Sequence, residues 1–167
     1  MLTRRRVLRA GAGVLAVAGF AGRTHSAQAA ALQTAMGESE LIYLTPIRTD
    51  GNESSCQAEV WFVHHGADLY VVTANDAWRA EAIGKGLART RIWVGDVGTW
   101  GDSDGAYRSL PQVEALASEV RDADTQNSVL DAMGGKYSVE WFVWGPRFRN
   151  GLADGSRVML RYQPVTV

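Results

Sequence analysis

Residues 57–96 decide the fold of this chain, and they read QAEVWFVHHGADLYVVTANDAWRAEAIGKGLARTRIWVGD. Two runs rich in β-branched and aromatic residues, 59–65 and 69–73, flank the turn sequence His65-Gly66-Ala67-Asp68. Successive side chains of a strand point to opposite faces, and both runs carry large apolar residues on each face. The pattern predicts a β-hairpin, because a short glycine-containing turn between two such runs lets the chain reverse.

A short helix and another strand are expected after the hairpin. Asn75-Asp76 can cap a helix, and Gly84 and Gly86 limit its length. Residues 90–96 then return as a strand. A helix that starts directly after a strand presents free backbone N–H groups to an anion, so a block of this kind can hold an anionic planar cofactor.

The remainder of the chain predicts more strands than helices. Strands are expected over residues 40–48, 112–121 and 156–162, and short helices over residues 30–37 and 125–133. The second helix should be capped by Asp124 and stopped by Gly134-Gly135, and the polar, glycine-rich residues 96–109 should form a mobile loop that carries Trp100 and Tyr107. About six mostly antiparallel strands favour a mainly-β fold, a small closed barrel with short helices, because closure removes exposed sheet edges.

The first 29 residues have the three parts of an export signal. A cationic start, Thr3-Arg4-Arg5-Arg6-Val7-Leu8-Arg9, precedes an apolar run over 10–21 and then Ala27-Gln28-Ala29. The start is similar to a twin-arginine signal, and cleavage is expected after Ala29. The sequence therefore predicts an exported protein, periplasmic or extracellular, with one domain over residues 30–167.

Composition excludes several classes of function. With 46% hydrophobic and 21% charged residues, the chain is of ordinary globular type. The signal holds five of the 17 basic residues and none of the 18 acidic ones, so the remainder carries a net charge of about −6, which argues against nucleic acid as a partner. The single cysteine, Cys56, excludes an internal disulfide. No metal site and no catalytic residue can be assigned, since no Ser-His-Asp, Cys-His or paired-carboxylate pattern is present.

Four segments carry a family resemblance. They are Val60-Trp61-Phe62, Tyr70-Val71-Val72-Thr73, Trp78-Arg79 and Arg91-Ile92-Trp93-Val94-Gly95. With the order of elements, they resemble the flavin-binding split-barrel superfamily, which includes pyridoxamine 5'-phosphate-oxidase-like proteins and deazaflavin-dependent nitroreductases. The similarity extends more loosely through Lys136-Tyr137 to the last strand.

The resemblance implies a cofactor, FMN or a deazaflavin, and a homodimer. It places Val60 and Trp61 along the isoalloxazine ring, and Thr73 and Ala74 beside the ribityl-phosphate. Arg79 stands where the oxidases have a phosphate-binding lysine, and Trp78 matches a tryptophan of the deazaflavin branch. The protein would then be an oxidoreductase that transfers hydride or electrons to a small organic acceptor, with the cofactor supplying the chemistry.

Three departures keep a second class of function open. The oxidases usually carry an arginine at the position of Ala58 and a serine and an arginine at those of Ala77 and Trp78, so the expected phosphate pocket has fewer donors. The alternative is a non-catalytic split-barrel module that holds haem or another small hydrophobic ligand. His64 or His65 could then be a single haem ligand, while an exposed turn position is the simpler reading for both. Trp141, Phe142 and Trp144 could stack on a flat ligand, but core packing or a dimer interface is favoured.

Overall fold

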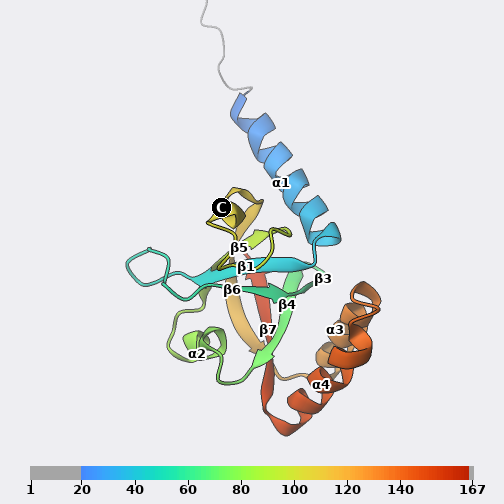
Figure 1. The fold of residues 1–167 in the computed structure, drawn as a ribbon. Coiled ribbons are helices and arrows are strands. Elements are labelled where there is room, and N and C mark those ends of the chain that lie inside the picture. Colours follow the sequence, from blue (N-terminus) through green and yellow to red (C-terminus); the bar gives the residue numbers. More distant parts are fainter. Residues whose placement is uncertain (1–19, 166–167) are drawn as a thin grey trace, which may run out of the picture.

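The computed structural model describes residues 20–165, and side-chain exposure from residue 26 onward. Seven antiparallel strands form one sheet in the order β2-β1-β5-β6-β7-β4-β3, which curls into a nearly closed barrel (Figure 1). The strands are β1 Leu41–Pro46, β2 Ala58–Trp61, β3 Val63–His65, β4 Asp68–Ala74, β5 Arg89–Val94, β6 Gln112–Val120 and β7 Arg157–Pro164. The helices are α1 Phe20–Glu38, α2 Trp78–Gly84, η1 Ala106–Ser109, α3 Ala123–Lys136 and α4 Trp141–Asp154. The predicted mainly-β barrel is confirmed.

β3 and β4 form the predicted hairpin. His65 pairs with Asp68, and Gly66 between them has a φ of 65°, a left-handed conformation that glycine adopts at little cost. The prediction of a single strand over residues 59–65 is wrong, however, because Phe62 divides it. Ala58–Trp61 pairs with β1, whereas Val63–His65 pairs with β4. Side-chain alternation is local, so it does not reveal that the pairing partner changes.

Alternate side chains of the strands fill the barrel. The largest fully buried members of this interior cluster are Ile42, Leu44, Phe62, Leu69, Val71, Ile92, Val94, Leu160 and Tyr162. Burying each such apolar side chain stabilises the fold by about 1.5–3 kcal/mol. Their neighbours along each strand face outward. On the outer face of β3, β4 and β7, the strand residues Val63, Tyr70, Val72 and Met159 are covered by Val129, Leu130 and Met133 of α3, its C-cap Tyr137, and Phe148 of α4.

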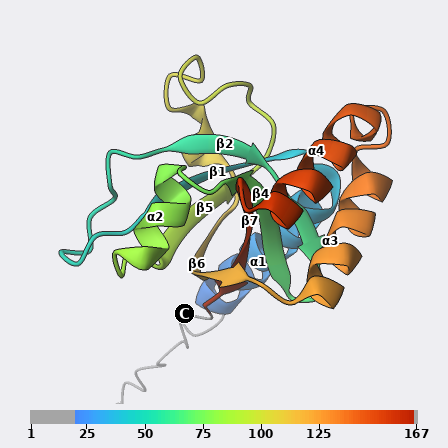
Figure 2. The same cartoon turned by 90° about the horizontal axis from the view of Figure 1, so that it is seen from below.

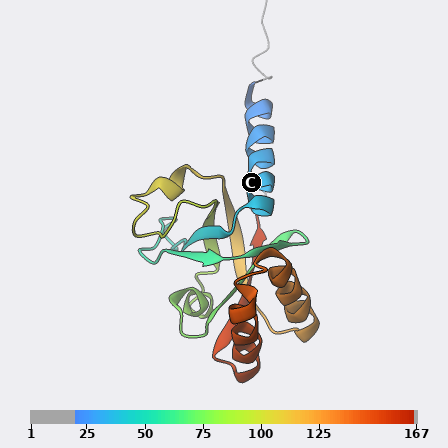
Figure 3. The same ribbon diagram turned by 45° about the vertical axis from the view of Figure 1, so that its right-hand side comes forward.

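The helices lie around the barrel at three places. α1 and α2 lie at opposite ends of the barrel (Figure 1), and α3 and α4 pack side by side along its flank (Figures 2 and 3). α1 contains the predicted helix over 30–37 but begins earlier, and it contacts the interior cluster through Leu32, Ala35 and Met36. Within residues 20–165, no helix has both the length and the hydropathy that a membrane crossing requires. Most of the predicted signal lies outside the described residues.

Two details of α3 differ from the prediction. Its N-cap is Asp122, whose carboxylate accepts from the Thr125 N–H at 2.8 Å, whereas Asp124 lies inside the first turn. The helix also continues through Gly134-Gly135 to Lys136. A Cβ on Gly134 would lie 2.7 Å from Nε1 of Trp141, so this glycine makes room for the ring that joins α3 to α4. The glycine pair serves packing rather than termination.

The loop between β5 and β6 covers the outer face of β1 and β5. Tyr107 is buried, stacks on Tyr43 with ring centroids 5.4 Å apart, and meets Trp93 edge to face. Trp100 is 38% exposed. One aromatic residue of this loop therefore anchors it to the barrel, and the other lies at the surface.

Candidate functional site

The barrel is open along one line, between β2 and the second half of β4, and we call this opening the split. β2 pairs with β1 along one edge only. β3 pairs with Asp68–Tyr70 of β4 but not beyond, so residues 71–74 have no strand partner on that edge among the described residues. Backbone N–H and C=O groups on these two edges are not paired by a ladder, so they are candidates for hydrogen bonds to a ligand.

The six residues predicted to hold a cofactor all flank the split. Val60 and Trp61 lie on β2, Thr73 and Ala74 at the end of β4, and Trp78 and Arg79 at the start of α2. Val60 and Trp78 pack against the interior cluster, whereas Trp61 packs on the outer face. The structure thus brings the six together around one opening, with side chains on both sides of the barrel wall. Their role in binding stays a prediction.

Arg79 has the least satisfied charge around the split. Its Nε is buried and has no hydrogen-bond partner, and no carboxylate within residues 20–165 forms an ion pair with its guanidinium. Burial lowers the pKa of Arg79, and the nearby Tyr162 and Glu59 oppose that shift only in part. The Trp78 ring centroid, 5.9 Å from Cζ, is at the limit of a cation–π contact. The guanidinium can therefore take an anionic partner.

Thr73 supplies the second unsatisfied group. The residue is 1% exposed, and its Oγ1 has no partner in the part of the chain that the structure describes. Thr73 belongs to the same face of β4 as Val71 and Leu69, which point into the barrel. Tyr162 on β7 is buried in the same interior; burial raises its pKa, and the charge of Arg79 acts in the opposite direction. At this end of the barrel, the part of the chain that the structure describes thus offers no partner to one hydroxyl and one guanidinium.

A corner closes the split at Phe62, where the wall passes from β2 to β3. The Tyr137 hydroxyl accepts from the Phe62 N–H at 3.0 Å and lies 2.7 Å from Phe62 O and 2.6 Å from Glu40 O. Lys136 Nζ donates to Phe62 O at 3.0 Å and lies 3.6 Å from the centroid of the Phe62 ring. Burial lowers the pKa of Lys136 to about 8, and the charges of Asp96 and Glu40 oppose the shift.

Aromatic rings line the outer side of this corner. Trp61 stacks on Tyr137 with centroids 4.6 Å apart and planes 9° apart, and meets Trp144 edge to face at 6.1 Å. The guanidinium carbons of Arg147 and Arg157 lie 5.1 and 5.9 Å from the Trp144 centroid. The sequence marks Trp144 as an aromatic that packs, but it assigns no role to Tyr137, which lies 75 residues from its hydrogen-bond partner.

Two features limit what the split can bind. α2 has seven residues, and its N-cap, Ala77, has no side chain to accept a hydrogen bond. The expected cap residue Asn75 instead donates to Gly155 O at 2.7 Å, so the predicted capping by Asn75-Asp76 is wrong. With Ala58 on β2 also lacking a donor, the groups left to donate to a ligand are backbone N–H groups, Thr73 Oγ1 and Arg79.

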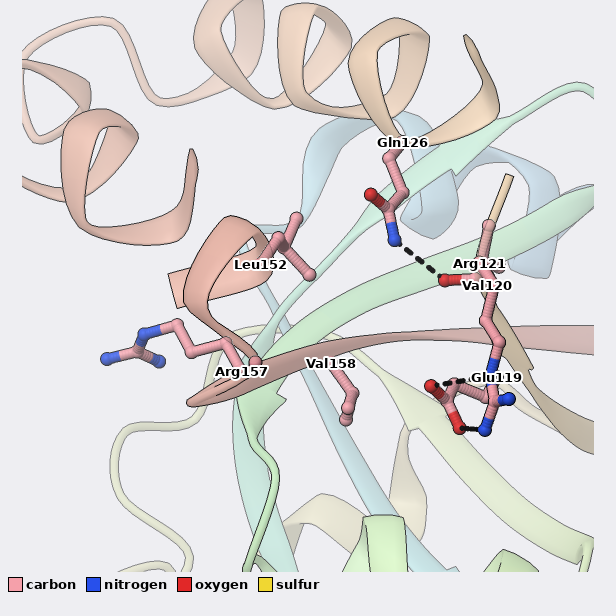
Figure 4. Close-up of a pocket in the computed structure, with 8 residues that line it drawn as sticks. Glu119, Val120, Arg121, Gln126, Leu152, Arg157 and Val158 are labelled. Atoms are coloured by element: carbon pink, nitrogen blue, oxygen red, sulfur yellow. Dashed lines mark hydrogen bonds and ion pairs between the residues drawn. The ribbon is translucent and has the colours of Figure 1, made fainter. Parts of the chain in front are cut away.

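Other candidate residues lie away from the split. His64 is half-buried and His65 exposed on β3, and Nε2 of His65 lies 3.1 Å from Ser128 Oγ. Cys56 is exposed, and no cluster of possible metal ligands occurs within residues 20–165. An open hollow of about 330 Å³ lies between the ends of β6 and α4, where Gln126 binds Val120 O (Figure 4). A second, of about 440 Å³, lies beside His65. Neither is lined by any of the six predicted residues.

Comparison with known proteins identifies the fold. No family profile and no curated protein matches the chain. HutZ, a haem storage protein from Vibrio cholerae, superposes with a TM-score of 0.56 at 17% identity over 81% of this chain and 89% of that one. A candidate pyridoxamine 5'-phosphate oxidase from Listeria innocua gives 0.54 at 15% identity over 81% and 91%, and an F₄₂₀ reductase gives 0.50 at 16% identity over 80% and 93%. The chain therefore has the split-barrel fold expected from the resemblance.

Proposed function

We propose that this chain binds FMN or a deazaflavin at the split and acts as an oxidoreductase toward a small organic acceptor. One observation carries the proposal: the guanidinium of Arg79 is partly buried, has no carboxylate partner in the described chain, and keeps its Nε without an acceptor. A buried donor that makes no hydrogen bond costs about 1–3 kcal/mol, and a bound anion that accepts from it would recover this free energy. The likeness to an F₄₂₀ reductase and to a candidate oxidase supports the cofactor class at the level of fold.

The residues of the split would divide the binding. Arg79 would hold the anionic group, and Thr73 Oγ1, the other buried side-chain atom for which the described residues provide no partner, would donate a hydrogen bond to it. The free backbone edges of β2 and β4 would bind the polar edge of the ring system, and Trp61 would offer it an apolar surface. A bound flavin or deazaflavin supplies hydride or electron transfer.

The visible spectrum of the protein purified from the cytoplasm tests this proposal. A flavin or deazaflavin spectrum near stoichiometric with protein is expected, or else saturable uptake of added FMN or deazaflavin. Arg79→Ala should weaken that uptake. A colourless protein that takes up neither cofactor would overturn the proposal, and unchanged affinity in Arg79→Ala would remove this residue from the site.

A non-catalytic module that holds haem or another small hydrophobic ligand is the second candidate. The likeness to HutZ, a haem storage protein, favours it. His64 is the better iron ligand of the two histidines, since it is half-buried while His65 lies at the exposed turn. Adjacent strand residues point to opposite faces, so only one of them could serve. A Soret band in the same spectrum, lost in His64→Ala, would select this candidate.

The homodimer and the export route are also proposals. Val139, just before α4, and Phe142 and Val143 in its first turn are 75%, 86% and 53% exposed, and such an apolar patch suits a second copy of the chain. Sedimentation of the wild type and of Phe142→Ser would test this. Cleavage after Ala29 by the twin-arginine route rests on the sequence of the first 29 residues alone. N-terminal sequencing of the secreted protein would test it, and a chain retained in the cytoplasm would refute it.

A further inference from the structure

We propose that Tyr137 is a positioning residue of the split, acting through Phe62 and Trp61. The inference rests on the proposed function for its effect on the cofactor, although its effect on the barrel can be measured separately. It places part of the control of the site on α3, outside the barrel.

β2 and β3 are the two ends of the sheet order, and Phe62 alone joins them. Neither ladder includes Phe62, so its N–H and C=O would lack partners in a buried position. Tyr137 and Lys136 bind both groups. The corner that sets where β2 lies relative to β4 is therefore held by side chains from α3 and its C-cap.

The number of protons available at the corner explains why both Tyr137 and Lys136 are needed. The Tyr137 hydroxyl has one proton, yet two carbonyl oxygens, Glu40 O and Phe62 O, lie within 2.7 Å of it. It can donate to one carbonyl while it accepts from the Phe62 N–H. Lys136 Nζ lies 3.0 Å from Phe62 O and donates to this carbonyl, so the phenol is free to donate to Glu40 O. The pair thus satisfies three backbone groups with no competition for the proton.

The ring of Tyr137 acts on the other side of the same strand. Trp61 immediately precedes the corner on the free edge of β2, and its indole stacks on Tyr137 with planes 9° apart. Stacking of this kind fixes the indole more narrowly than burial alone. Tyr137 therefore holds the backbone of the split through its hydroxyl and the aromatic surface of the split through its ring.

Tyr137→Phe tests the hydroxyl alone in the full chain. Amide exchange over residues 58–62 should accelerate, while exchange in β6 stays as in the wild type. The dissociation constant for FMN should rise about fivefold to tenfold, the loss that one neutral hydrogen bond commonly represents. Tyr137→Leu should add a change in tryptophan fluorescence, because it also removes the stacked ring.

Tyr43→Phe is the matched control. The Tyr43 hydroxyl is also bound to two backbone groups, accepting from Val97 N–H at 3.0 Å and donating to Gly98 O at 2.6 Å, but in the loop over β5. It should lower the melting temperature comparably and leave exchange over 58–62 and FMN affinity unchanged. Equal effects of the two variants on affinity, or unchanged exchange over 58–62 in Tyr137→Phe, would overturn the inference. If the wild type takes up no FMN, the proposed function fails, and the exchange measurement alone still decides the role of Tyr137.

Discussion

Replacing Arg79 with methionine should stabilise the cofactor-free protein and weaken cofactor binding at the same time. Methionine keeps most of the apolar length of the side chain but removes a guanidinium whose buried Nε has no partner within residues 20–165. An unsatisfied buried donor costs about 1–3 kcal/mol, and the low end applies because the side chain is only half-buried. We expect a gain of about 1 kcal/mol, which corresponds to about 3 °C in Tm for a domain of this size.

Binding should change in the opposite direction. A charge-assisted hydrogen bond contributes about 1.5–3 kcal/mol, so the dissociation constant for the cofactor should rise about 10- to 150-fold. Urea unfolding of the cofactor-free protein measures the first effect, and a fluorescence titration with FMN or a deazaflavin measures the second. The opposite signs separate a ligand-binding arginine from a structural one, which would lose stability on replacement.

Lys85→Met provides the control for charge and for helix α2. Lys85 is the C-cap of α2, is exposed and pairs with Glu81 at 2.7 Å. Exposed pairs of this kind contribute little, so stability should stay within about 0.5 kcal/mol and affinity should not change. Our account of the split is refuted if Arg79→Met destabilises the cofactor-free protein, or if it binds the cofactor as tightly as the wild type.

Three further predictions concern packing, charge and the N-terminal helix. Gly134→Ala should lower the free energy of unfolding, measured in urea, by about 1–3 kcal/mol, because the new Cβ would lie 2.7 Å from the Trp141 ring. Gly135 has open space around it, so Gly135→Ala should raise the free energy of unfolding by up to about 1 kcal/mol. The stability of the wild type relative to Lys136→Met should rise between pH 8 and pH 10, because the folded state releases this proton near pH 8 and the unfolded chain holds it to about 10.5. A chain that begins at Ala30 should melt at the same temperature as the full chain, because residues 26–31 are exposed and Leu32 is the first packed side chain among those described from residue 26 onward.

Each of these has a clear contrary result. Equal effects of the two glycine variants would show that the tryptophan ring moves aside. If the difference in unfolding free energy between the wild type and Lys136→Met does not change from pH 8 to pH 10, the lysine keeps its ordinary pKa. The comparison stops at pH 10 because burial raises the pKa of Tyr43 and of Tyr137. Above that pH these phenols deprotonate in the unfolded chain first, which destabilises the fold. A lower melting temperature for the shortened chain would place stabilising contacts upstream of Ala30.

Local sequence patterns were enough to predict the hairpin and most of the strands of this fold. The two runs around His65-Gly66-Ala67-Asp68 predict the hairpin because a two-residue turn and the alternation of strand side chains are both set within a few residues. The strands β1, β5, β6 and β7 follow from the same reasoning, and the resemblance to split barrels placed six candidate residues that the structure gathers around one opening. Local sequence predicted the helix ends less well. Asp122 and Asp124 are equally good N-cap residues for α3, and the end of β6 decides which of them caps the helix.

Only the tertiary structure decided which groups form the split. Periodicity cannot show that Phe62 leaves both ladders, because pairing depends on strands that lie far away in sequence. It cannot show that Tyr137 binds a backbone 75 residues distant, or that Arg79 has no carboxylate partner among residues 20–165 while other arginines find one. Whether a polar group is satisfied depends on every group around it in space. For that reason the sequence by itself determined the strands of this barrel, and the folded chain determined where the barrel stays open.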